Sequence, residues 1–81
     1  MEKHIRNSKE LGEAIRRVRV YKNLRQIDIA KSASVRQALV SEVEIGVTSA
    51  KVDTIIRILA ALDMDLSIVP RRKAEFDPTE Y

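Results

Sequence analysis

The sequence predicts an all-α domain of four to five helices that ends in one short strand. The 81 residues include only two glycines and two prolines, which are the residues that most often interrupt helices. Apolar side chains recur at spacings of three and four over most of residues 8–62, as they do on one face of a helix. Residues 66–69 instead alternate and are rich in β-branched side chains, which is typical of a strand. Because aromatic residues make up only 4% of the chain, the core must be aliphatic.

The first helix is predicted over residues 8–22. Asn7 and Glu10 stand at the spacing of a capping box, in which Asn7 caps the helix and Glu10 reaches back. Lys22 and Asn23 suit a helix C-terminus. The predicted buried stripe consists of Leu11, Ala14, Ile15, Val18 and, at its end, Tyr21.

Two short helices follow, over residues 26–32 and 36–44. Ser34 stands three residues before Gln37, again at capping-box spacing, and Gly46 is a stop signal for the second of the two helices. The residues expected in the core are Ile27, Ile29 or Ala30, Ala33, Leu39 or Val40, and Val43.

The last helix is predicted over residues 51–62, with Thr48 and Ser49 as candidate caps. It has the strongest apolar pattern of the chain, formed by Val52, Ile55, Ile56, Ile58, Leu59 and Leu62.

The strand, Leu66, Ser67, Ile68 and Val69, has no partner strand in the sequence. Unpaired backbone groups cost free energy, so we expect this strand to pair with its copy in a homodimer, joined also through the last helix. The alternative is a short extended tail that lies on that helix. We expect residues 1–7 to form a flexible arm, residues 8–69 the domain, and residues 70–81 a flexible tail. In the tail, Phe76 and Tyr81 are either anchors for a partner protein or have no role.

Composition excludes several kinds of function. The chain has no cysteine, so it can form no disulfide, thiolate zinc site or thiol nucleophile. Its one histidine, His4, has no carboxylate at a useful spacing, so we expect neither an enzyme, nor a metal site, nor a cofactor. No apolar run is long enough to span a membrane and the N-terminus does not resemble a signal peptide, so we expect a cytoplasmic protein.

Charge and helix spacing point to nucleic acid. Residues 1–36 carry ten basic and four acidic side chains, whereas residues 37–81 carry five and eight. A basic half suggests a polyanion partner, although a solvated charged face is the alternative. The two short helices meet at a joint of three to four residues, which is helix-turn-helix spacing.

The exposed face of residues 36–44 carries groups that can read base edges in a major groove. Arg36, Gln37, Ala38 and Ser41 are the predicted base contacts. Glu42 ranks lower, because it would repel phosphates unless it accepts a hydrogen bond from cytosine. Gln26, at the start of the preceding helix, is a predicted phosphate contact, and the other predicted phosphate contacts are Arg25, Thr48, Ser49 and Lys51.

At this point the sequence resembles a family. The segment Leu24–Arg25–Gln26–Ile27–Asp28–Ile29–Ala30, with Val35, Val40–Ser41–Glu42–Val43–Glu44 and Gly46, resembles the XRE/phage-repressor helix-turn-helix pattern over residues 11–62. The resemblance implies a lambda-repressor-like fold and a partly buried salt bridge between Arg19 and Glu44. It departs at Ser34, where the family has glycine in a turn of positive φ, and at Arg25, where the family has a capping threonine.

The segment from Thr54 to Val69 is similar to HipB-type antitoxins. That similarity implies a homodimer that represses its own operon and neutralises a HipA-type serine/threonine kinase toxin in a type II toxin–antitoxin system. Two alternatives remain. A stand-alone phage-type repressor would have no kinase gene beside it, and a protein-interaction adaptor would never bind DNA.

Overall fold

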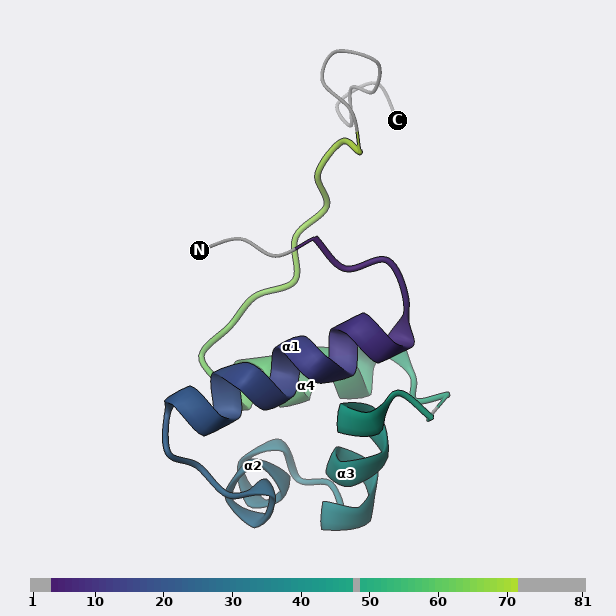
Figure 1. Ribbon diagram of the computed structural model, residues 1–81. Coiled ribbons are helices and arrows are strands. Elements are labelled where there is room, and N and C mark those ends of the chain that lie inside the picture. The colour runs from purple at the N-terminus through teal and green to yellow at the C-terminus, as the bar shows by residue number, and fades with distance from the viewer. Residues whose placement is uncertain (1–3, 48, 72–81) are drawn as a thin grey trace.

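The structure, a computed structural model, describes residues 4–47 and 49–71 and consists there of four helices (Figure 1). They are α1 (Ser8–Tyr21), α2 (Gln26–Ala33), α3 (Gln37–Ile45) and α4 (Val52–Ala61). Each boundary lies within one residue of the predicted one. No strand occurs in the described ranges. None of these four helices is long and apolar enough to cross a membrane.

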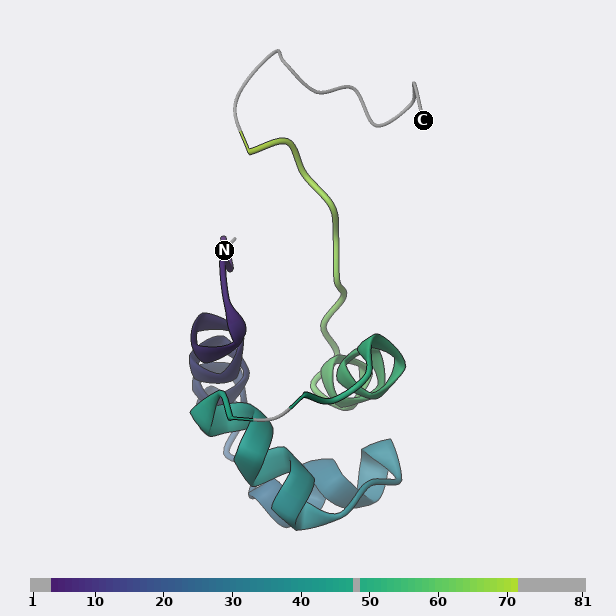
Figure 2. The same cartoon turned by 90° about the vertical axis from the view of Figure 1, so that its right-hand side faces the viewer.

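The helices form two layers (Figures 1 and 2). α1 and α4 make one layer, and α2 and α3 make the other. α1 packs on α3, while α2 packs on both α3 and α4. The chain on either side of the helices, residues 4–7 and 64–71, leaves the molecule on the side opposite α2 and α3.

The core lies between the layers and is aliphatic, as predicted. Every helix contributes to it, and the most deeply buried side chains are those of Ile15, Ile29, Val40, Ile58 and Leu62. Of the alternative core residues, Ile29 and Ala30 in α2 are both buried, and in α3 Val40 is buried while Leu39 is half-buried. Ile27, also predicted for the core, is half-buried.

Three residues predicted for the core are exposed instead. Tyr21 is 87% exposed, Val52 65% and Ile56 45%. Tyr21 is the last residue of α1. Val52 and Ile56 lie at one edge of an apolar arc on α4 that is wider than the surface α2 can cover, so an apolar strip remains on the outside of α4.

The caps differ in part from those predicted. Asn7 Oδ1 accepts the backbone N–H of Glu10 at 2.9 Å, as expected, but Glu10 reaches back to the N–H of Arg6 at 2.7 Å rather than to Asn7. The N-cap of α3 is Arg36 and not Ser34, and that of α4 is Lys51 and not Ser49; neither side chain makes a capping bond. A side chain can cap only the turn that directly follows it, and these helices begin later than the predicted caps require.

Both glycines lie where α1 approaches α3 most closely. A Cβ atom on Gly12 would overlap the carbonyl oxygen of Val43 and lie 2.5 Å from that of Glu44. Gly46 ends α3 with φ at +81°, as its predicted stop role requires, and a Cβ there would lie 2.7 Å from Cα of Lys9. These contacts let the two helix backbones almost touch, which places α3 firmly against α1.

Residues 66–69 are extended and leave α4 rather than lying along it (Figure 2). Their apolar side chains are exposed: Leu66 is 55% exposed, Ile68 83% and Val69 48%. Residues 4–47 and 49–71 of one chain offer this segment no strand partner, so the predicted pairing across a homodimer remains a prediction. Thr48, Phe76 and Tyr81, together with most of the predicted tail, lie outside the described residues.

Candidate nucleic-acid interface

The joint between α2 and α3 redirects the chain within three residues, Ser34, Val35 and Arg36. Ser34, directly after α2, has φ 58° and ψ 46°, the left-handed conformation. The N–H of Val35 then donates to the carbonyl of Ala30 at 3.0 Å, which closes the end of α2. Arg36 is extended and α3 begins at Gln37. The turn therefore has the positive φ of the family pattern even though serine replaces glycine.

We expect Ser34→Gly to stabilise the fold by about 1 kcal/mol, because glycine adopts the left-handed conformation without the clash that a Cβ atom introduces. The midpoint of urea unfolding measures the change. Ser32→Gly is the matched control, since Ser32 lies inside α2, where glycine costs about 0.5–1 kcal/mol. A fall in stability for Ser34→Gly would contradict the assigned strain.

The start of α3 presents polar groups to the outside of the molecule. Arg36, Gln37 and Ala38 are exposed and Ser41 is half-buried, whereas Val40, Val43 and Glu44 on the opposite side of the helix are buried. The four predicted base-contacting residues therefore share one surface. Glu42 also lies on it and lines an open hollow with Ser34, Val35 and Arg36 beside the turn.

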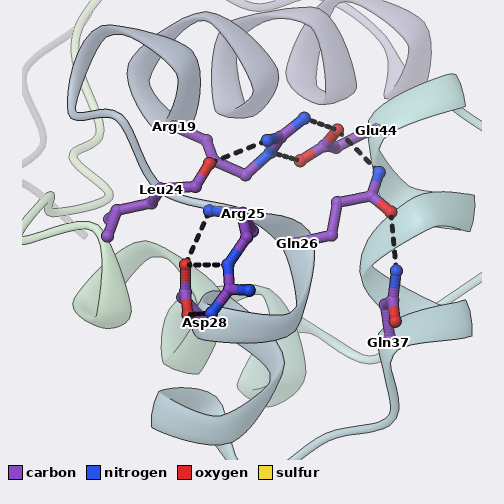
Figure 3. A network of polar contacts seen from close by, with 7 residues as sticks. All are labelled: Arg19, Leu24, Arg25, Gln26, Asp28, Gln37 and Glu44. Atoms are coloured by element: carbon purple, nitrogen blue, oxygen red, sulfur yellow. Dashed lines mark hydrogen bonds and ion pairs between the residues drawn. The ribbon is translucent and has the colours of Figure 1, made fainter.

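The ion pair expected between α1 and α3 is present (Figure 3). Arg19 Nε donates to Glu44 Oε2 at 2.6 Å and Nη2 donates to Oε1 at 3.0 Å. A third guanidinium nitrogen donates to the carbonyl of Leu24 at 2.9 Å, just before α2. The hydrogen bonds to Glu44 raise the pKa of Arg19 above its ordinary value. Because the Glu44 side chain is only 2% exposed, the pair joins α1, α3 and the entry to α2 inside the molecule.

Gln26, predicted as a phosphate contact, has its side chain engaged within the protein. Its Nε2 donates to Glu44 Oε1 at 3.0 Å, and its Oε1 accepts from Gln37 Nε2 at 3.5 Å. Its backbone N–H, at the first position of α2, donates to no atom of the described residues. This backbone N–H and the second N–H of Nε2 donate to no atom of the described residues and are free to meet an anion, whereas the side-chain carbonyl oxygen faces Gln37.

Residues 15–69, more than half of the chain, match the HTH_3 helix-turn-helix family. The chain belongs to this family. The matched range starts in α1, includes the whole α2–turn–α3 unit, and extends through the exposed segment 66–69.

Solved structures share the fold of this HTH_3 protein. A HipB variant in complex with an O2 20mer has a TM-score of 0.82 at 22% identity, covering 89% of this chain and 100% of that one. A chain of the HipA-HipB-O2-O3 complex has a TM-score of 0.81 at 22% identity, with 88% of this chain and 100% of that one covered. The restriction-modification controller protein C.AhdI from Aeromonas hydrophila has a TM-score of 0.65 at 27% identity, with 68% and 83% covered. No curated protein matches the chain.

Arg25 in this HTH_3 protein is held by a neighbour that the sequence analysis did not single out. Its backbone N–H donates to Asp28 Oδ2 at 2.8 Å, and its guanidinium donates to both carboxylate oxygens of Asp28, at 3.0 and 3.2 Å. Asp28 thus supplies the N3 half of a capping box by accepting the N–H of the N-cap residue, whereas the hydroxyl acceptor of a capping threonine has no counterpart here. The i, i+3 spacing of Arg25 and Asp28 is the sequence feature that could have predicted this pair. The Arg25 side chain is 77% exposed and remains at the surface beside the start of α2.

The Arg25 side chain and backbone N–H lower the pKa of Asp28 below its ordinary value. The unfolded chain, whose aspartates titrate near pH ~3.9, therefore takes up a proton first as the pH falls. The stability that this pair supplies is complete above that pH and is lost as the pH falls through the folded pKa. We expect Asp28→Asn to show a smaller loss of stability than the wild type between about pH 5 and pH 2.

The urea midpoint measured across this pH range tests the prediction for Asp28. Asp53→Asn is the control, because Asp53 is an exposed carboxylate at the start of α4 that makes no side-chain bond in the part of the chain described. Identical pH dependence in the wild type and Asp28→Asn would show that the pair adds nothing to acid resistance.

The remaining predicted phosphate contacts lie between α3 and α4. Ser49 and Lys51 are exposed, and Lys51 directly precedes α4. They belong to the segment that leaves the C-terminal end of α3, whereas Arg25 and Gln26 are at the start of α2. In the sequence, the candidate phosphate contacts therefore lie both before and after α3, and the candidate base contacts lie between them.

Proposed function

We propose that this HTH_3 protein is a sequence-specific DNA-binding transcriptional repressor that acts as a homodimer in the cytoplasm. The observation that carries the proposal is the position of α3: its first residues are exposed and polar while its other side is fixed to α1 by the Arg19–Glu44 pair and by the close contact at Gly12. A rigidly held helix with a polar outer start is what a major groove accepts.

Each exposed side chain at the start of α3 has a suitable partner on a base edge. Gln37 can bind adenine N6 and N7, Arg36 guanine or a phosphate, Ala38 the thymine methyl group, and Ser41 a base or a phosphate. Glu42 can accept a hydrogen bond from cytosine N4. These contacts would supply specificity, because phosphate contacts carry no base information.

Phosphate contacts come from the two ends of the motif. The free N–H of Gln26 lies at a helix N-terminus, where the backbone favours an anion. Arg25, Ser49 and Lys51 add exposed donors, and Thr48 belongs to the same proposed set. Such contacts make affinity depend on salt.

A fluorescence-anisotropy titration of the chain against its own upstream duplex tests this function. We expect log K to fall linearly with log[salt], with a slope of about −0.9 for each phosphate contact. Gln37→Ala should weaken binding to this duplex by about 1–3 kcal/mol and leave binding to an unrelated duplex almost unchanged. Arg36→Ala should weaken binding more than Arg17→Ala, which removes an exposed charge from α1. A flat salt dependence, or equal losses for the two arginine variants, would refute the proposal.

Dimerisation is proposed through the strand Leu66, Ser67, Ile68 and Val69 and through the outer strip of α4. Support comes from exposure: the backbone of the extended segment 66–69 forms no backbone hydrogen bond with any other described residue, and Val52 and Ile56 on α4 are open to solvent. A two-fold axis would pair each segment with its copy and present two α3 helices to successive major grooves of a palindrome. Sedimentation as a monomer at micromolar concentration would contradict this arrangement.

We further propose that the repressor is the antitoxin of a type II toxin–antitoxin system, and that it binds and neutralises a HipA-type serine/threonine kinase and regulates its own operon. Support comes from the likeness of fold to HipB, including HipB in a complex with HipA. Phe76 and Tyr81 are the proposed anchors for the kinase. Co-purification with a kinase encoded beside this gene, lost in a Phe76→Ala/Tyr81→Ala variant, is the expected result. A stand-alone repressor would have no such partner, and an adaptor would bind the partner but no DNA.

A further inference from the structure

A continuous chain of hydrogen bonds leads from the interior of the protein to the base-reading surface (Figure 3). It begins at Arg19, whose guanidinium donates to both oxygens of Glu44. Gln26 Nε2 donates to Glu44 Oε1 at 3.0 Å, and Gln37 Nε2 lies 3.5 Å from Gln26 Oε1. Burial decreases from Glu44 outward: the Glu44 side chain is 2% exposed, Gln26 is half-buried and Gln37 is exposed.

The buried carboxylate determines which way each amide group points. A carboxylate facing a guanidinium can only accept hydrogen bonds, so Gln26 must turn its NH₂ group toward Glu44. Its carbonyl oxygen then points outward and can only accept. Gln37 must in turn direct its own NH₂ group toward Gln26. The Arg19–Glu44 ion pair therefore sets which side of the Gln26 and Gln37 amides donates and which accepts. An isolated amide could rotate by 180° at little cost.

The remaining groups of Gln37 match one base better than the others. One N–H of Gln37 is used by Gln26, which leaves one N–H and the carbonyl oxygen for DNA. Adenine offers one acceptor, N7, and one donor, the N6 amino group, and fits this pair. Guanine offers two acceptors, N7 and O6, and its O6 would face the Gln37 carbonyl oxygen.

We propose that the Arg19–Glu44 ion pair is a specificity-determining element, which fixes the orientation of the Gln37 amide through Gln26 and so makes this position select adenine over guanine. The inference rests on the proposed DNA-binding function. Glu44 and Gln26 are positioning residues: they act on the base through Gln37. The expected preference for adenine is roughly 10- to 100-fold, the usual range for a good bidentate base contact.

The decisive change is Glu44→Gln. An amide at this position can donate as well as accept, so Gln26 is free to turn its carbonyl oxygen inward and its NH₂ group outward. Gln37 can then accept from Gln26 and offer both of its own N–H groups to guanine. The variant should bind adenine and guanine duplexes within about threefold of each other. Gln26→Leu, which leaves the ion pair intact but breaks the path, should also lose most of the preference.

The experiment first selects duplexes from a randomised DNA pool with the full wild-type chain. The base pair read by Gln37 is the one at which Gln37→Ala loses preference. Affinities of the wild type, Glu44→Gln and Gln26→Leu are then measured for duplexes with adenine, guanine and 7-deazaadenine at that position. Ile58→Val is the control, since it weakens the core in α4 without touching the path, and it should keep the wild-type ratio.

The outcomes separate the two proposals. A ratio of adenine to guanine affinity that falls in Glu44→Gln and Gln26→Leu but not in Ile58→Val supports the inference. An unchanged ratio in both variants, with Gln37→Ala still losing its preference, overturns the inference and leaves the proposed function standing. Failure of the wild type to enrich any sequence overturns both.

Discussion

Gly12→Ala is expected to lower the free energy of unfolding by about 1–3 kcal/mol, although alanine is the better helix former. The new methyl group would overlap backbone carbonyl oxygens of Val43 and Glu44 in α3. Backbone atoms within a helix cannot turn aside as a side chain can, so α1 and α3 must move apart. That movement would separate Arg19 from Glu44 and displace the base-reading surface.

Urea unfolding of Gly12→Ala, followed by circular dichroism, measures this loss. Glu13→Ala is the matched control, because Glu13 is the next residue of α1 and is exposed. We expect that control to stay within about 0.5 kcal/mol of the wild type. A Gly12→Ala variant more stable than the wild type would show that α1 and α3 are not packed as closely as described.

Arg19→Ala is expected to cost about 3–5 kcal/mol of stability, because it leaves the Glu44 carboxylate buried without its cation. The carbonyl of Leu24 would lose its guanidinium donor at the same time. Removal of both charges should be milder: the double variant Arg19→Leu/Glu44→Leu is expected to recover most of the loss, since a buried pair replaced by apolar groups is often neutral.

The same unfolding measurement separates the pair from charge in general. Arg17→Ala removes an exposed arginine from the same helix and should change stability by less than about 0.5 kcal/mol. If Arg19→Ala and Arg17→Ala were equally mild, Glu44 would not need its partner, and the ion pair would have no structural role.

Much of the fold was predictable because its signals are local. The 3–4 spacing of apolar residues located four helices to within one residue at each end, and Gly46 marked the end of α3. The left-handed turn at Ser34 was implied by the family pattern despite the absence of glycine. Tyr21, Val52 and Ile56 were wrongly assigned to the core, because periodicity gives the direction of an apolar arc but not how much of it a neighbour covers.

The site was predictable in its residues but not in its connections. The resemblance implied the Arg19–Glu44 pair, and the outer face of residues 36–44 followed from helix geometry. The link from Glu44 through Gln26 to Gln37 joins residues that are distant in sequence, and no local pattern encodes it. The role of Gly12 was missed for the same reason, since close approach of two backbones is a tertiary property.

Both ends of the described chain depart from the pole of the molecule opposite α2 and α3 (Figures 1 and 2). A ligand bound at the α2–α3 side leaves the opposite side, with the two chain ends, open to solvent. Two ligands bound on opposite sides would therefore not overlap sterically. Any effect of one on the binding of the other would have to pass through the helices between them.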